Sequence, residues 1–127
     1  MAPLFRKSEE RIAREAAAQT EIQRLKGLST EELAVLVLPG LGPENAAPGH
    51  NLRPQQICEY LLRDFPGIGQ TLPLQLMGVV RRALERLEEA DLVSSFAISR
   101  SPVWSITDLG VSVLAEGTAA QRLAAPS

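Results

Sequence analysis

The chain has 127 residues, a formal net charge of −2, 45% apolar residues and only 4% aromatic residues. This length suits one domain with short appendages and leaves little room for a second domain. No apolar run is long enough to cross a bilayer, and the first residues lack an apolar signal core, so we expect a cytoplasmic protein without a membrane partner. A slightly acidic balance argues mildly against non-specific nucleic-acid binding, which usually shows as a basic excess.

Residues with catalytic or metal-binding chemistry are scarce. The chain has one histidine, His50, and one cysteine, Cys58, which is predicted to be buried because it lies in an apolar helical segment. The Gly67-Ile68-Gly69 sequence lacks the third glycine of a phosphate-binding loop and is interpreted more economically as a turn. We therefore expect no enzyme activity, no cofactor and no metal site.

The first predicted element is a helix over residues 8–26, which is rich in strong helix formers and has Ser8 as a candidate cap. Its apolar residues form two short rows, Ile12 with Ala16 and Ala18 with Ile22 and Leu25. These rows are too short to bury the helix in a core alone. We expect Ile12, Ile22 and Leu25 to bind a partner protein or a second copy of the chain, and the remaining domain to fold without this helix. The alternative is a solvated charged helix.

Residues 29–32 form a capping box, Ser29-Thr30-Glu31-Glu32, in front of the apolar run from Leu33 to Leu38. A short, largely buried helix is therefore predicted there. Residues 39–43 carry two prolines and two glycines, which are expected to break this helix and to begin a loop that reaches Asn51 and includes His50.

Two further helices follow. Pro54 suits the first turn of a helix that extends to about Asp64, and residues 65–70 end it. Thr71 is a candidate cap for the next helix, with Pro73 near its start. The apolar residues of that helix recur at helical spacing: Leu72, Leu76, Val80, Ala83, Leu87 and Ala90.

The period then changes from helical spacing to strand alternation. Phe96 with Ile98, and Trp104 with Ile106, predict two short strands joined at residues 100–102. Each pair is expected to share a face, with Trp104 and Ile106 directed inward and Phe96 or Ile98 beside them. Residues 107 and 108 can cap a closing helix over residues 109–116.

Two segments of this region resemble a known family. They are ALERLEEADLV (residues 83–93) and WSITDLG (residues 104–110). They resemble the end of the recognition helix and the segment after the wing in winged helix-turn-helix regulators of the multiple-antibiotic-resistance and phenolic-acid-repressor type, with Asp91 where that family usually has glycine. The resemblance implies a mainly α fold with a small β-hairpin. It divides the chain into an N-terminal helical extension (residues 1–28), a winged helix domain (29–117) and a flexible tail (118–127). The implied function is that of a DNA-binding transcriptional regulator, which is expected to be a homodimer because such regulators grip two half-sites of double-stranded DNA.

The predicted recognition helix turns a polar face away from its apolar stripe. With the hairpin tip, this face supplies five candidate DNA contacts: Gln75, Gly78, Arg81, Arg82 and Arg100. A glutamine amide can pair with an adenine edge, arginine can bind guanine or phosphate, and glycine permits close backbone approach.

Two other interpretations remain open. Arg81 and Arg82 can instead pair with Glu85 and Glu89 along the helix. The domain can also be a protein-protein interaction module, or a subunit of a regulatory assembly, that binds no DNA. Residues 51–117 favour this alternative because they contain six arginines against eight acidic residues, and because two apolar residues, Leu74 and Met77, lie near the start of the helix.

Overall fold

The computed structural model describes residues 2–46 and 51–124, with side chains from Glu9 onward. The described part is mainly helical and contains one antiparallel two-stranded hairpin, which confirms the predicted fold class. The elements in chain order are α1 (Ala2–Lys26), α2 (Thr30–Leu41), α3 (Pro54–Leu61), the 3-10 turn η1 (Pro73–Leu76), α4 (Met77–Glu89), β1 (Val93–Ile98), β2 (Ser101–Ile106), α5 (Asp108–Glu116) and α6 (Ala119–Ala124). His50 lies outside the described residues.

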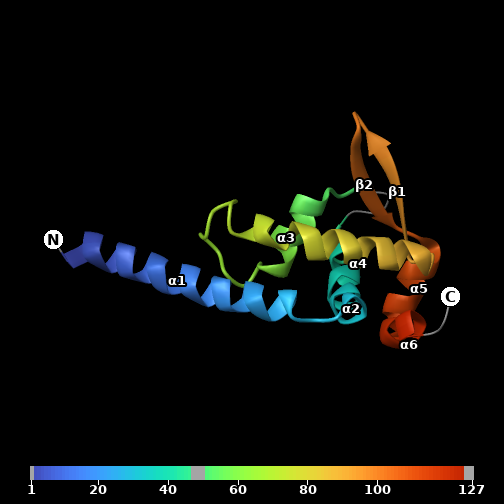
Figure 1. Cartoon of the computed structure of the whole chain (residues 1–127), viewed down its shortest axis with the longest axis horizontal. Helices are drawn as coiled ribbons and strands as arrows, with labels where there is room; N and C mark the ends of the chain where they lie inside the picture. The colour runs from blue at the N-terminus through green and yellow to red at the C-terminus, as the bar shows by residue number, and fades with distance from the viewer. Residues whose placement is uncertain (1, 47–50, 125–127) are drawn as a thin grey trace.

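The N-terminal helix α1 is longer than the sequence predicts. It begins at Ala2, so Ser8 lies inside the helix and does not cap it. Pro3 falls in the first turn, where its missing N–H leaves no helical hydrogen bond unmade, and alanine and charged residues carry the helix onward. Its first half projects from the rest of the molecule, whereas its second half runs alongside the η1 turn that leads into α4 (Figure 1).

Helix α2 starts at the predicted capping box and ends within the segment predicted to break it. The Ser29 side chain accepts the Glu32 N–H at 3.1 Å, and the Glu32 carboxylate accepts the Ser29 N–H at 3.0 Å. The helix then includes Pro39 and Gly40 and ends at Leu41, so it ends within the predicted segment but not at its first proline. Gly40 explains part of the difference, because a Cβ there would lie 2.8 Å from the Tyr60 ring of α3. Packing against Tyr60 therefore favours the glycine in the helix.

The segment from α3 to α4 follows the prediction in its core residues but not at its ends. Helix α3 stops at Leu61, short of the predicted Asp64. Thr71 makes no side-chain cap, since a 3-10 turn with Pro73 at its start leads into α4 instead. On α4 the predicted stripe of Val80, Ala83 and Leu87 is completely buried. Helical spacing thus identified the face of α4 that packs on α2 and α3.

The hairpin turns one residue earlier than predicted. Ser99 and Arg100 are its two central residues and both have positive φ, 51° and 70°, which is the geometry of the tight turns that match strand twist. Trp104 pairs with Ser95, whereas Phe96 pairs with Val103 on the opposite face of the hairpin. The expectation that Phe96 or Ile98 lies beside Trp104 is therefore wrong.

The two faces of the hairpin pack differently, and each contains one buried residue: Trp104 on one face and Val103, which is 3% exposed, on the other. Trp104 is 6% exposed and packs on the core, with Leu52 bridging to it from the segment before α3. Phe96 and Ile98 are 49% and 41% exposed. On the free edge of β1, the Glu88 carboxylate accepts both the N–H and the hydroxyl of Ser95. This contact occupies the Ser95 N–H, one of the backbone groups through which another strand could pair with β1.

The end of α4, the hairpin and α5 meet at residues of the two quoted segments. Asp91 has a φ of 63°, a conformation that glycine adopts freely, and its carbonyl accepts the Thr107 hydroxyl at 2.7 Å. The same hydroxyl caps α5 by accepting the Gly110 N–H. A Cβ at Gly110 would collide with the Leu92 carbonyl, so glycine is required there for close approach. Thr107 and Gly110 therefore have structural roles in this junction.

The hydrophobic core extends into both terminal elements. On α1, Ala18 and Ile22 are fully buried and Leu25 is 2% exposed, all within one chain. Helix α1 is therefore not separate from the core of residues 29–117, and its removal would expose core residues. At the other end, α6 buries Leu123, whose carbonyl accepts the Arg86 guanidinium at 2.6 Å. The expected flexible tail is thus an ordered helix as far as Ala124.

Candidate nucleic-acid interface

The outer face of α4 and the η1 turn before it present the predicted polar residues. Gln75, Gly78, Arg81 and Arg82 are all exposed, on the side opposite the buried stripe. Gly78 is open to solvent, because no atom outside its chain neighbours and its own helix backbone lies within 4 Å of the position that a Cβ would take. The backbone can therefore be approached closely at this point of the helix.

Arg81 and Arg82 differ in their surroundings from the third arginine of the helix, Arg86. Within residues 2–46 and 51–124, neither Arg81 nor Arg82 forms an ion pair, so the predicted pairing with Glu85 and Glu89 is not seen for them. Arg86 is 15% exposed instead, and its guanidinium lies 3.6 Å from Glu31 and 3.9 Å from Glu89. Arg86 is thus a packing residue, whereas the other two guanidinium groups face solvent.

Arg100 lies at the exposed tip of the hairpin. The hairpin stands away from the helices near the C-terminal end of α4, so this side chain is carried well clear of the core (Figure 1). In the described part of the chain Arg100 forms no ion pair. The three arginines 81, 82 and 100 are therefore available to an anionic partner.

Gln75 is the predicted contact whose surroundings differ most from expectation. Its amide forms two hydrogen bonds with Gln19 of α1, at 3.0 and 3.1 Å. Sequence reasoning did not identify Gln19, because the two residues lie 56 positions apart and no local pattern links them. Gln75 is exposed, but its hydrogen-bonding edge is already occupied.

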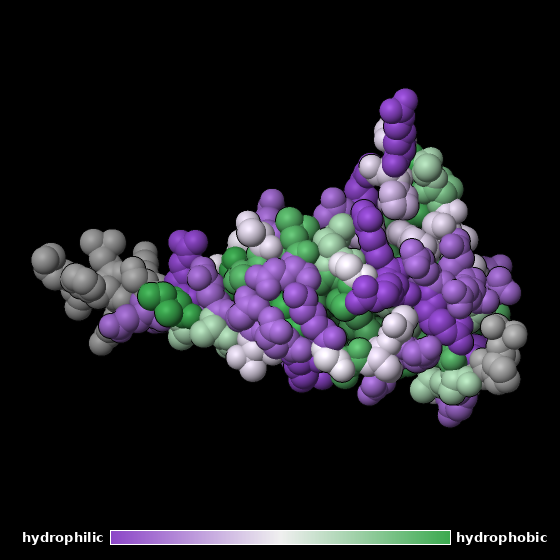
Figure 2. Space-filling model, viewed as in Figure 1, coloured by the Kyte–Doolittle hydropathy of each residue, from purple (hydrophilic) through white to green (hydrophobic). Residues whose placement is uncertain are grey.

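Apolar side chains are also exposed near this surface. Leu74 is 44% exposed, and Phe96 and Ile98 are exposed on the hairpin face opposite Trp104. In Figure 2 hydrophobic atoms gather just below the hydrophilic tip of the hairpin. The surface therefore combines cationic and apolar groups, with Glu85 and Glu89 exposed further along α4.

The residues of α1 that were predicted to bind a partner differ in exposure. Ile12 is 65% exposed on the projecting part of the helix. Ile22 and Leu25 are buried within the same chain, so their assignment to a partner surface is wrong. The apolar row that looked too thin for a core is sufficient because α1 lies against η1 and the core beneath it.

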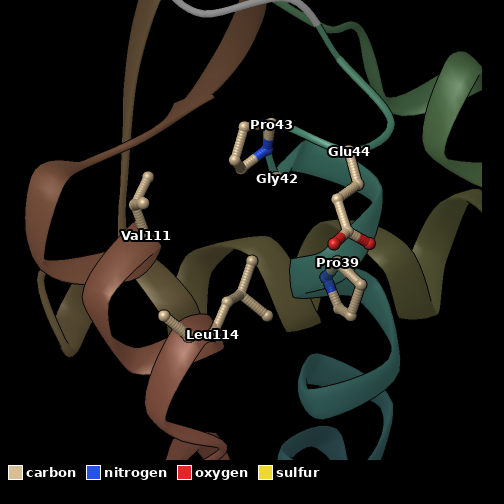
Figure 3. A pocket seen from close by; sticks show the side chains of 7 residues that line it. Pro39, Gly42, Pro43, Glu44, Val111 and Leu114 are labelled. Atoms are coloured by element: carbon tan, nitrogen blue, oxygen red, sulfur yellow. The ribbon is translucent and has the colours of Figure 1, made fainter.

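A small hollow lies at the end of α2, beside α5. It encloses about 240 Å³, with Val111 and Leu114 of α5 on one side and Pro39, Pro43 and Glu44 on the other (Figure 3). Its lining contains no nucleophile beside a base, since Glu44 is its one titratable side chain. This hollow offers no catalytic arrangement.

The single cysteine is buried as predicted, and burial raises the pKa of the Cys58 thiol to about 12. Such a thiol stays protonated and is a poor nucleophile.

Among the described residues there is no group of three or more potential metal ligands, and no helix there is long and apolar enough to cross a membrane. Comparisons of the chain with protein-family models, curated proteins and solved structures gave no match.

Proposed function

We propose that this chain is a DNA-binding protein of winged-helix type, with α4 as the groove-facing helix and the hairpin as the wing. The observation that carries the proposal is the set of three exposed arginines, 81 and 82 on α4 and 100 at the hairpin tip, which form no ion pair within the described part of the chain. Guanidinium groups that are not paired with a carboxylate of the same chain can bind phosphate without first breaking an ion pair. Exposed Gly78 supports the proposal, because it lets the helix backbone come close to DNA.

The local geometry around Asp91 and Gly110 supports the same assignment. Asp91 stands where the winged-helix family usually has glycine and adopts a positive φ, and Gly110 is the glycine of the second quoted segment, where a Cβ would collide with the Leu92 carbonyl. The proposed function rests on the arginines rather than on these positions, since a fold alone does not determine an activity.

The proposed contacts are mainly to the DNA backbone. Arg81, Arg82 and Arg100 are suited to phosphate or guanine, whereas Gln75 is held by Gln19. Binding is therefore expected to depend strongly on salt and weakly on sequence.

The experiment measures affinity for a short random-sequence DNA duplex by fluorescence anisotropy in low salt. Arg81→Ala, Arg82→Ala and Arg100→Ala are each expected to weaken binding and to reduce the salt dependence by about one unit where the lost contact is to phosphate. Arg122→Ala is the matched control, because it removes the same charge from an exposed position on α6. Equal loss in Arg122→Ala and the α4 variants would mean that net charge, not this surface, governs binding.

A second function, docking to another protein, is favoured by exposed Leu74, Phe96 and Ile98. Phe96 and Ile98 share one face of the hairpin, and exposed apolar side chains contribute to protein interfaces but add little to phosphate binding. Absence of DNA binding in low salt would make protein docking the better explanation. Phe96→Ser would then be the variant to test against a purified partner.

A further inference from the structure

A pair of amides joins α1 to the η1 turn in front of α4. Gln19 Nε2 donates to Gln75 Oε1 at 3.0 Å, and Gln75 Nε2 donates to Gln19 Oε1 at 3.1 Å. Each amide thus uses its oxygen and one N–H on the same partner. The two hydrogen bonds define the orientation of both side chains.

The core holds Gln19 in position. Its neighbour Ala18 and the next-turn residue Ile22 are fully buried, so the backbone at Gln19 cannot move far without opening the core. Five residues earlier in the same helix, the Arg14 side chain lies beside the turn before η1, where a Cβ at Gly67 would be 3.1 Å from the Arg14 Nη1 atom. Helix α1 is therefore a fixed part of the surface around Gln75.

Adenine recognition and the Gln19 pair require the same edge of the Gln75 amide. To bind adenine in the major groove, a glutamine accepts the N6 amino group with Oε1 and donates from Nε2 to N7. A reciprocal amide pair uses that oxygen and the N–H beside it in the same side-by-side arrangement. The two contacts therefore exclude each other.

We propose that Gln19 is a specificity-determining residue that prevents Gln75 from reading adenine. The inference rests on the proposed DNA-binding function and extends it to the role of α1. The wild-type chain then contacts DNA at this position without a base preference. Loss of the Gln19 amide frees the Gln75 edge, and the protein gains a preference for adenine at one position of its site.

The test is selection of bound duplexes from a random-sequence library, followed by sequencing, for each of four proteins. They are the wild type, Gln19→Ala, the double variant Gln19→Ala/Gln75→Ala, and Gln23→Ala. Gln23 is the matched control, since it is an exposed glutamine on the same helix, one turn away, with no side-chain hydrogen bond to Gln75. Melting temperatures of all four proteins establish that each is folded.

We expect Gln19→Ala to favour adenine at one position by about fivefold or more, as one bidentate contact allows. The wild type, Gln23→Ala and the double variant should show no such preference. Identical preferences for Gln19→Ala and the wild type would overturn the inference while leaving DNA binding in place. An adenine preference already present in the wild type would overturn it too. If the wild type selects no DNA in low salt, the proposed function and this inference fail together.

Discussion

The burial of α1 can be tested with two isoleucines of the same helix. Ile22 is fully buried, whereas Ile12 is 65% exposed. Ile22→Ala removes three buried carbon atoms, which at about 0.8 kcal/mol per buried methylene amounts to roughly 2.4 kcal/mol before any cavity is counted. The cavity left behind raises the expected loss to about 3 kcal/mol, within the usual range of about 2–5 kcal/mol for such changes.

Ile12→Ala is the control for the change itself. The same substitution in the same helix has the same effect on helix propensity, so the difference between the two variants reports burial alone. At the exposed position the free energy of unfolding should change by no more than about 0.5 kcal/mol.

The assay is unfolding in urea, monitored by the fluorescence of Trp104, which is the only tryptophan of the chain and is buried. For a chain of this size, the loss in Ile22→Ala corresponds to a melting temperature roughly 10 °C lower. Equal unfolding midpoints for the two variants would refute the conclusion that α1 belongs to the core.

Three further predictions concern the hairpin, the thiol and the α2 cap. Trp104→Ala should lower the free energy of unfolding by about 3–5 kcal/mol, measured by circular dichroism, because the ring is nearly completely buried; a loss below that of Ile12→Ala would contradict its placement. Cys58, with its pKa raised to about 12 by burial, should resist iodoacetamide in the native protein and react once urea unfolds it; rapid native labelling would show that the thiol is accessible. Accepting the Ser29 N–H lowers the pKa of Glu32, so its stabilisation is present above the ordinary carboxyl pKa and is lost as pH falls through the lowered value. Glu32→Gln should therefore reduce the acid sensitivity of unfolding, and an unchanged pH profile would count against this contact.

The elements that the sequence predicts correctly depend on local patterns. The capping box at Ser29 and Glu32 forms as expected, because both partners lie within one helical turn. The buried stripe of α4 follows helical spacing over residues 80–87, and the change to alternation locates the hairpin. Each of these signals is contained in a few neighbouring residues.

The errors arise where a distant contact outweighs the local pattern. Pro39 and Gly40 remain in α2 with the Tyr60 ring packed on the glycine, although both residues usually end a helix. The short apolar row at Ile22 is sufficient for burial because η1 and the core cover it. The hairpin turn is a different case, because its error is local: Ser99 and Arg100 adopt positive φ without glycine, and the turn lies one residue from its predicted place.

The candidate site was predictable only where local geometry determines it. Exposure of Arg81, Arg82 and Arg100 follows from helical geometry and the position of a hairpin tip. The occupation of Gln75 by Gln19 depends on how α1 packs against η1, which no sequence pattern indicates.

The salt dependence of DNA binding tests the central claim most directly. If Arg81, Arg82 and Arg100 each neutralise one phosphate, the logarithm of the binding constant should fall against the logarithm of salt concentration with a slope of roughly −2.7. The triple alanine variant should lose nearly all of this dependence and most of its affinity, while keeping the wild-type melting temperature. No measurable binding by the wild type in low salt, or the same slope in the triple variant, would contradict the account.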